Sequence, residues 1–238
     1  MRPINFVESS FDPGSRPIKF VELSFDPGSR NFGQSIVSIF NNKDSEKSEN
    51  YTFEHIKHVD LIGTDGKKSD TEHILNNLNR HLKTNSSISN FVALSKNPKY
   101  NIEVGIECQE GVGRGKGSGA LAKSLIKMGV ISGHVAGYFL EKGIRVKFLP
   151  KKSKWNYSEK EQDDGDNITQ QKPKGKITKK NHKINTINTI VTILENNNTK
   201  THRAILKWRN KNKTKFVHVA DSISGGMERL RHRINEKV

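Results

Sequence analysis

Hydrophobic and polar residues alternate along this chain with two distinct periods. Short runs of period two, rich in β-branched and aromatic residues and closed by turn residues, predict β-strands. Longer stretches with apolar residues three and four positions apart predict amphipathic helices. The predicted strands cover residues 18–25, 35–40, 51–61, 100–107 and 144–149.

Helical periodicity appears between the later strands and again towards the C-terminus. Ser69 and Glu72 fit a capping box at the start of the first predicted helix, which continues through Lys83. The adjacent Gly225 and Gly226 lie inside the last helix, where each costs about 1 kcal/mol against Ala, and they indicate either a break or close packing. The remaining helical segments are residues 118–142, 184–194, 202–208 and 216–231.

The order of these elements predicts the fold class. Three strands come first, and two further strands are then separated from one another and from the first three by helices. Hairpin-connected strands followed by strands that alternate with helices are typical of a mixed sheet with helices on its faces. The sequence therefore predicts an α/β fold built on a mixed five-stranded sheet flanked by helices.

One internal segment lacks both periods. Residues 155–183 contain very few apolar side chains and carry the acidic run EKEQDDGD and then the lysine-rich run KPKGKITKKNHK. Such a composition cannot bury enough apolar surface to offset chain entropy, so we expect a disordered or loosely ordered insertion. The lysine run is either a solvated linker or an arm that follows DNA phosphates.

A short repeat begins the chain. RPINFVESSFDPGS, starting at Arg2, recurs as RPIKFVELSFDPGS, starting at Arg16. Two copies of 14 residues are too few for a solenoid and indicate a local duplication. The second copy continues into Gly33 and the second strand, as a hairpin requires, whereas the first continues into Arg16-Pro17, and proline cannot donate to a sheet. We therefore prefer Asp26 over Asp12 as the structurally placed aspartate.

The overall charge narrows the class of partner. Lys and Arg number 41 against 25 Asp and Glu, which gives a formal net charge of +16 and favours a polyanionic partner such as nucleic acid. Cys108 is the single cysteine, so an internal disulfide and a cysteine-based zinc site are excluded. No apolar run approaches the length of a membrane span, and no signal pattern starts the chain, so we expect a soluble, intracellular protein.

Three acidic residues occupy positions where an α/β nuclease needs them. Asp26 ends a predicted strand at an Asp-Pro-Gly turn, Glu107 ends the fourth strand, and Asp221 lies in the last helix three residues after His218. Carboxylates that meet at the carboxyl edge of a sheet bind Mg²⁺ through oxygen, and two such ions hydrolyse phosphodiesters. Each motif alone is more typical of a turn, a strand end or a surface pair; together they point to one metal site.

In this order the motifs resemble those of the RuvC-type Holliday-junction resolvases of the RNase H-like superfamily, including the related poxvirus and giant-virus enzymes. The matching features are the Asp-Pro-Gly turn with Gly33, Glu107 before a glycine-containing loop and helix, the strand end FLPKKSKW, and His-x-x-Asp in the last helix. The resemblance covers about residues 17–154 and 200–232. It implies a nuclease domain formed by residues 17–154 and 184–238, preceded by a duplicated extension at 1–16 and interrupted by the insertion at 155–183.

The same resemblance implies an activity and a site. The expected activity is resolution of four-way DNA junctions by a homodimer that makes paired, Mg²⁺- or Mn²⁺-dependent cuts. The implied metal ligands are Asp26, Glu107, His218 and Asp221. Basic residues that follow the fourth and fifth strands are expected near this edge as DNA contacts, and Lys154 could also stabilise charge in the transition state. The expected DNA contacts are Arg114, Lys116, Lys151, Lys152 and Lys154.

Two glycine-rich segments have other interpretations. The segment from Gly111 to Gly117 is similar to a phosphate-binding loop, but Gly117 stands where the Mg²⁺-binding Ser or Thr belongs, so we interpret it as a flexible basic loop. Gly129, Gly133 and Gly137 form a small-residue stripe, which we expect to pack against the sheet rather than against another helix.

Two other functions fit the same residues less directly. A nuclease of this fold could act on a flap, a replication fork or an RNA–DNA hybrid, because the substrate is not fixed by these motifs. A DNA-binding protein with a decayed nuclease site is the other alternative, against which the intact set of four candidate ligands argues.

Overall fold

The computed structural model describes residues 19–40, 51–62, 70–108, 118–150, 179–197 and 199–235. The strands are β1 (Lys19–Asp26), β2 (Phe32–Phe40), β3 (Thr52–Val59), β4 (Tyr100–Cys108) and β5 (Val146–Pro150). The helices are α1 (Thr71–Thr84), α2 (Ser86–Leu94), α3 (Ser118–Leu140), α4 (Lys179–Asn197), α5 (Lys200–Lys211) and α6 (Lys213–Asn235).

The strands form one mixed sheet in the order β3-β2-β1-β4-β5, so the predicted α/β fold on a mixed five-stranded sheet is confirmed. β1, β2 and β3 pair antiparallel, and β4 and β5 join them in parallel. The hairpin of β1 and β2 closes where Asp26 lies opposite Gly33. Because β1, β4 and β5 run in the same direction, their carboxyl ends lie at a single edge of the sheet.

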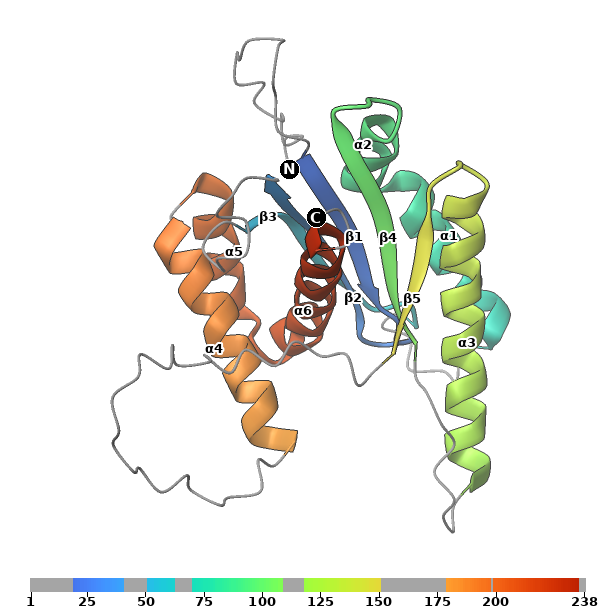
Figure 1. The fold of residues 1–238 in the computed structure, drawn as a ribbon. Helices are drawn as coiled ribbons and strands as arrows, with labels where there is room; N and C mark the ends of the chain where they lie inside the picture. Colours follow the sequence, from blue (N-terminus) through green and yellow to red (C-terminus); the bar gives the residue numbers. More distant parts are fainter. Residues whose placement is uncertain are drawn as a thin grey trace, which may run out of the picture.

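Helices cover both faces of the sheet (Figure 1). On one face α1, α2 and α3 pack over a core that includes Leu23, Phe25 and Val104. On the other face α4, α5 and α6 pack over a second core that includes Phe20, Val37 and Ile223. Within the described residues, no helix is both long enough and apolar enough to cross a lipid bilayer.

Strand β1 shows how the sequence assigns its faces. Val21, Leu23 and Phe25 point into the first core. Side chains alternate along a strand, so Glu22 and Asp26 point to the opposite face, towards α6. Their environments differ, since Glu22 is fully buried in the middle of the sheet whereas Asp26 keeps some solvent contact at the edge.

The sequence placed the strands within a few residues but misplaced several helix boundaries. α1 begins after Asp70, whose carboxylate accepts a hydrogen bond from the His73 backbone N–H at 2.8 Å, so the capping residue is not Ser69. α2 was not predicted; Asn85 caps it by accepting from the backbone N–H groups of Ser87 and Ile88. α4 begins at Lys179, so the last five residues of the segment expected to be disordered are helical, and the rest of that segment lies outside the described residues.

The atoms around the glycines of α6 and α3 show what these glycines do. α6 is continuous through the glycine pair, and a Cβ on Gly226 would lie 2.9 Å from Ser24 Oγ and 3.1 Å from Val37 Cγ2, so this glycine permits close packing on the sheet. The prediction for the α3 glycines is wrong. A Cβ on Gly129, Gly133 or Gly137 would meet no atom within 4 Å, so this stripe faces away from the sheet.

Candidate metal centre

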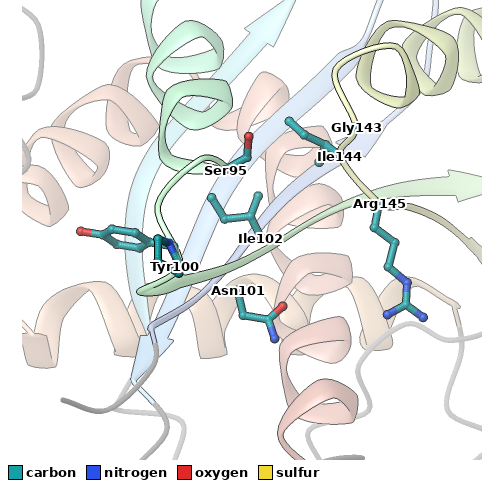
Figure 2. Close-up of a pocket in the computed structure, with 8 residues that line it drawn as sticks. Ser95, Tyr100, Asn101, Ile102, Gly143, Ile144 and Arg145 are labelled. Carbon is teal, nitrogen blue, oxygen red and sulfur yellow. The ribbon is translucent and has the colours of Figure 1, made fainter. Parts of the chain in front are cut away.

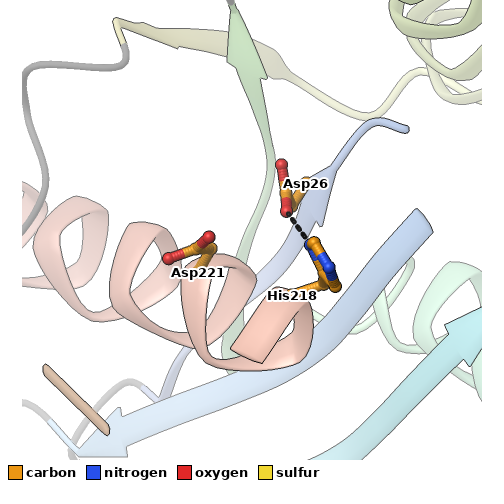
Figure 3. A group of neighbouring side chains, drawn as sticks. All are labelled: Asp26, His218 and Asp221. Atoms are coloured by element: carbon orange, nitrogen blue, oxygen red, sulfur yellow. Dashed lines mark ion pairs between the residues drawn. The ribbon is translucent and has the colours of Figure 1, made fainter. Parts of the chain in front are cut away.

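Three of the four predicted ligands meet at the carboxyl edge of β1. Asp26, His218 and Asp221 each offer a ligand atom, and these atoms all lie within 4.8 Å of one another. Asp26 extends from the end of β1, and the other two side chains come from neighbouring turns of α6, with the Asp26 carboxylate facing the His218 ring (Figure 3). His218 Nδ1 lies 3.8 Å from Asp26 Oδ2. All three residues are partly buried.

Close packing of α6 on the β1–β2 hairpin creates this group. Gly33 lies opposite Asp26, and a Cβ on Gly33 would collide with the backbone carbonyl of His218. Only glycine therefore lets this turn of α6 approach the hairpin so closely. The Asp-Pro-Gly turn and the downstream glycine thus have separate tasks: the first ends β1 at Asp26 and the second admits the helix.

Glu107 reaches the same edge but not the same group. β1 and β4 are parallel, with Phe25 opposite Ile106, so the next residue on each strand is Asp26 and Glu107 respectively. Alternation along β4 directs Glu107 to the α6 face, since Val104 and Ile106 belong to the core on the other face. Its carboxylate is not among the three that lie within 4.8 Å of one another.

The predicted DNA contacts lie outside the described residues. Arg114 and Lys116 fall in the segment after β4, and Lys151, Lys152 and Lys154 fall in the segment after β5. The structure shows where the two segments that contain these residues begin. β4 ends at Cys108 and β5 at Pro150, at the edge of the sheet that holds Asp26.

Sequence reasoning missed a second histidine beside the group. His58 on β3 has its ring centroid 6.2 Å from that of His218, and its Nε2 lies 3.2 Å from Asn31 Oδ1. Burial, and then electrostatic interaction with Lys215 and His218, lower the pKa of His58, while Asp60 opposes them. No local motif marks His58, because only the register of β3 with β2, which places it opposite Gly33, brings it to the site.

Below the group, ion pairs join β1 and β4 to the C-terminal part of α6. Glu22 on β1 lies beside Glu103 on β4, and Arg233 Nη1 lies 2.7 Å from Glu22 Oε2, while Arg229 Nη2 lies 2.7 Å from Glu103 Oε2. Burial raises the pKa of Glu22 to about 7, against the opposing attraction of Arg233 and then of Arg229. These two carboxylates are thus neutralised by arginines of α6, whereas the Asp26 carboxylate faces an imidazole at an edge open to solvent.

A separate pocket lies at the other end of β4. Its volume is about 350 Å³, and Figure 2 shows its lining, which includes Tyr100, Asn101, Ile102 and Ile144. The charged residue of the lining is Arg145, whose guanidinium lies 3.0 Å from Glu103 Oε1. The pocket lies at the start of β4 and the Asp26 edge at its end, so the full length of the strand lies between them. The pocket therefore adds nothing to the metal group.

The three side chains fit a divalent cation. Carboxylate oxygens are the donors that Mg²⁺ and Mn²⁺ take, and an imidazole nitrogen is a ligand that first-row transition metals accept. Separations of up to 4.8 Å between donor atoms are close to those across a coordination sphere with bonds of 2.0–2.2 Å, so small side-chain rotations suffice. Partial burial lowers the local dielectric constant while leaving access for a phosphate and a water.

Comparison with known proteins gives similarity only at the level of the backbone. No family model matches this chain, and no curated protein matches it. Among solved structures, it is similar to "T. thermophilus RuvC in complex with Holliday junction substrate", with a TM-score of 0.49 and 12% identity over 91% of this chain and 96% of that one. It is also similar to "Thermus thermophilus RuvC structure", with a TM-score of 0.44 and 12% identity over 91% of this chain and 95% of that one. At such identity no residue's role follows from the likeness.

Proposed function

We propose that this protein is a metal-dependent endonuclease that cuts branched DNA, with the four-way junction as its preferred substrate. The observation that carries the proposal is the convergence of Asp26 with His218 and Asp221 at an open sheet edge. Residues almost 200 positions apart in the sequence supply a donor set for a divalent cation. The net charge of +16 supports a polyanionic substrate, and the motif resemblance supports the junction.

In this proposal the chain's own residues bind and orient the reacting groups. Asp26, His218 and Asp221 would hold Mg²⁺ or Mn²⁺, and Glu107 at the end of β4 would supply a further carboxylate at this edge. The bound metal would activate a water and stabilise the leaving oxygen of a phosphodiester. Lys154 would stabilise negative charge in the transition state, and the basic residues after β4 and β5 would hold the phosphates on either side of the cut.

A homodimer is part of the proposal, because two cuts across a junction need two sites. Support comes from the outward face of α3, which carries Ile126, Val130, Gly133, Gly137 and Leu140; we call these five residues the α3 stripe. Ile126 is 66% exposed and Leu140 58% exposed. Spacings of four and three residues repeat along the stripe, as in a helix that packs against a second helix, and the two glycines allow close approach.

Incubation of the purified protein with labelled substrates tests this function. The substrates are an immobile four-way junction, a 5′ flap and a linear duplex of the same sequence, each with Mg²⁺, with Mn²⁺ and with EDTA. We expect paired nicks in the junction with either metal, little cutting of the duplex, and none in EDTA. Preferential cutting of the flap would show that the flap, and not the four-way junction, is the preferred substrate. Cutting in EDTA would refute the metal mechanism.

A further inference from the structure

α5 and the start of α6 carry a charge pattern that the metal centre does not explain. Between residues 199 and 220 the sequence contains seven Lys and Arg residues and no Asp or Glu. This stretch covers all of α5 and the first two turns of α6. It lies outside the segments in which the sequence predicted DNA contacts.

α5 is firmly attached to the sheet through its inner side. His202 and Ile205 are buried, and His202 Nε2 accepts a hydrogen bond of 3.1 Å from the backbone N–H of Phe53 on β3. Burial lowers the pKa of His202, so its ring is neutral and can accept. The helix thereby satisfies a backbone donor on an edge strand, which gives it a structural reason to lie there and a fixed orientation.

The outer side of α5 is cationic along its whole length. Spacings of three, four and four residues place its basic side chains on one helix face, about 16 Å long. Ala204 and Asn210 are its exposed neighbours and carry no charge. We call this surface the α5 basic face; its members are Lys200, Arg203, Lys207 and Lys211, all of them exposed.

A helix face that merely keeps a protein in solution usually mixes acids with bases. Glu four residues before Lys stabilises a helix by a few tenths of a kcal/mol, and like charges at this spacing destabilise it by a similar amount. On the α5 basic face, Arg203, Lys207 and Lys211 succeed one another at this repulsive spacing. A polyanion would relieve that repulsion and release its own counterions on binding.

The basic surface continues towards the metal centre. Lys213 and Lys215 are exposed in the first turn of α6. Lys215 precedes His218 by three residues on α6, about one helical turn, and the His58 ring adjoins that of His218. A phosphate backbone can therefore follow positive charge from α5 to the edge of the sheet that holds Asp26.

We propose that the α5 basic face binds the phosphate backbone of a duplex DNA arm that leaves the metal centre on the β3 side. This inference rests on the proposed function for its substrate but concerns binding alone. About five phosphates of one strand pass along 16 Å of duplex, since each strand carries one per 3.4 Å, so four cations can each meet a phosphate. The contacts carry no sequence information and set the position of the arm.

The test compares two variants that lose the same charge. In one, Lys200, Arg203, Lys207 and Lys211 are all changed to Gln. In the matched control, four exposed basic residues near the first core, Arg80, Lys83, Lys96 and Lys99, are changed to Gln. Affinities for a linear duplex and for a four-way junction are measured in EDTA over a series of salt concentrations. Thermal unfolding of both variants checks that the fold is kept.

Each lost phosphate contact lowers the slope of log affinity against log salt by about 0.9. We expect the α5 variant to lose about two to four units of slope on both DNAs and the control variant less than one. Equal losses in the two variants, or no loss in the α5 variant, would overturn the inference. The outcome is independent of cleavage: a protein that cuts no junction but shows the selective loss of slope keeps its DNA-binding face and loses only the proposed activity.

Discussion

At the scale of single residues, position on the sheet decides what each carboxylate does. Glu22 and Asp26 lie on the same face of β1, four residues apart. Glu22 is in the middle of the sheet, fully buried and 2.7 Å from Arg233, whereas Asp26 is at the strand end beside His218. The same side-chain chemistry therefore stabilises the attachment of α6 at one point and offers a metal ligand at the other.

The buried His81 gives a prediction at this scale. Burial, then Lys57 and His55, lower the pKa of His81 from 6.5 to about 4, so the folded protein resists its protonation while the unfolded chain does not. Stability is therefore lost as the pH falls from about 6.5 towards 4. At pH 5 the loss from this residue is about 2 kcal/mol relative to pH 7.

His81→Gln removes this titration while leaving an amide beside Gln34, whose Oε1 lies 2.7 Å from His81 Nε2. Urea unfolding at pH 7 and at pH 5 measures the effect. We expect wild type to lose about 2 kcal/mol more than the variant between these two pH values. The same loss in both proteins would show that His81 does not resist protonation in the folded state.

Local sequence motifs identify some residues of the candidate site but not others. Asp26, His218 and Asp221 could be named from sequence because each sits in a short motif, a turn or one helix face. His58 could not, because its place depends on the pairing of β3 with β2, including an irregularity in that pairing between Ile36 and Val37. Nor could Glu22 and Glu103 be recognised as structural, since only their pairing with α6 arginines reveals it.

At the scale of elements, hydrophobic periodicity located the strands and most helices. It failed where tertiary contacts determine the start, the existence or the orientation of a helix. α4 begins earlier than composition predicts, at Lys179, and its inner side packs Ile190 and Leu194 into the second core. α2 has only nine residues, too few for a clear helical pattern of apolar residues, and its start is marked by the Asn85 cap. The orientation of α3 was predicted wrongly because small residues pack equally well against a sheet and against a second helix.

Substitutions of the two adjacent glycines test how closely α6 packs on the sheet. A Cβ on Gly226 would press on Ser24 and Val37, whereas a Cβ on Gly225 would make ordinary contact with Leu149 at 3.4 Å. Alanine favours helix over glycine by about 1 kcal/mol at either position. We expect Gly226→Ala to destabilise by about 1–3 kcal/mol and its control Gly225→Ala to be neutral or stabilising, as measured by chemical denaturation. A reversed order would contradict this account of the packing.

The α3 stripe predicts the oligomeric state. Ile126→Lys combined with Leu140→Lys places charge on both ends of the stripe, where two copies would meet. We expect sedimentation equilibrium to show a dimer for wild type and a monomer for this variant. The control is Ile184→Lys on α4, an equally apolar side chain that is 45% exposed, and it should remain dimeric. Dissociation of the control variant alone, or a dimer that survives both α3 substitutions, would move the interface elsewhere.

At the scale of the whole molecule, the sheet divides two tasks between its faces. The face under α1, α2 and α3 is covered by an apolar core. The face under α6 has an apolar core too, but it also carries Glu22 and Glu103, paired with α6 arginines, and ends at the candidate metal group. α5 covers the free edge of β3 and adds basic surface on that side. The mixed five-stranded sheet could be predicted from sequence because three strands precede the first helix, whereas the strand order comes from the structure. The path of DNA could not, because it depends on which helix faces turn outwards.

The duplicated N-terminus provides a control for the role of Asp26 as a metal ligand, since both copies contain the sequence Asp-Pro-Gly. The decisive measurement is the rate of four-way junction cleavage in Mg²⁺ by wild type, Asp26→Asn and Asp12→Asn, with junction binding measured in parallel. We expect Asp26→Asn to bind the junction still but to cut at least about a hundredfold more slowly, because the amide loses the charge that holds the ion. We expect Asp12→Asn to cut as wild type does. Cleavage by Asp26→Asn at the wild-type rate would show that Asp26 is not a metal ligand.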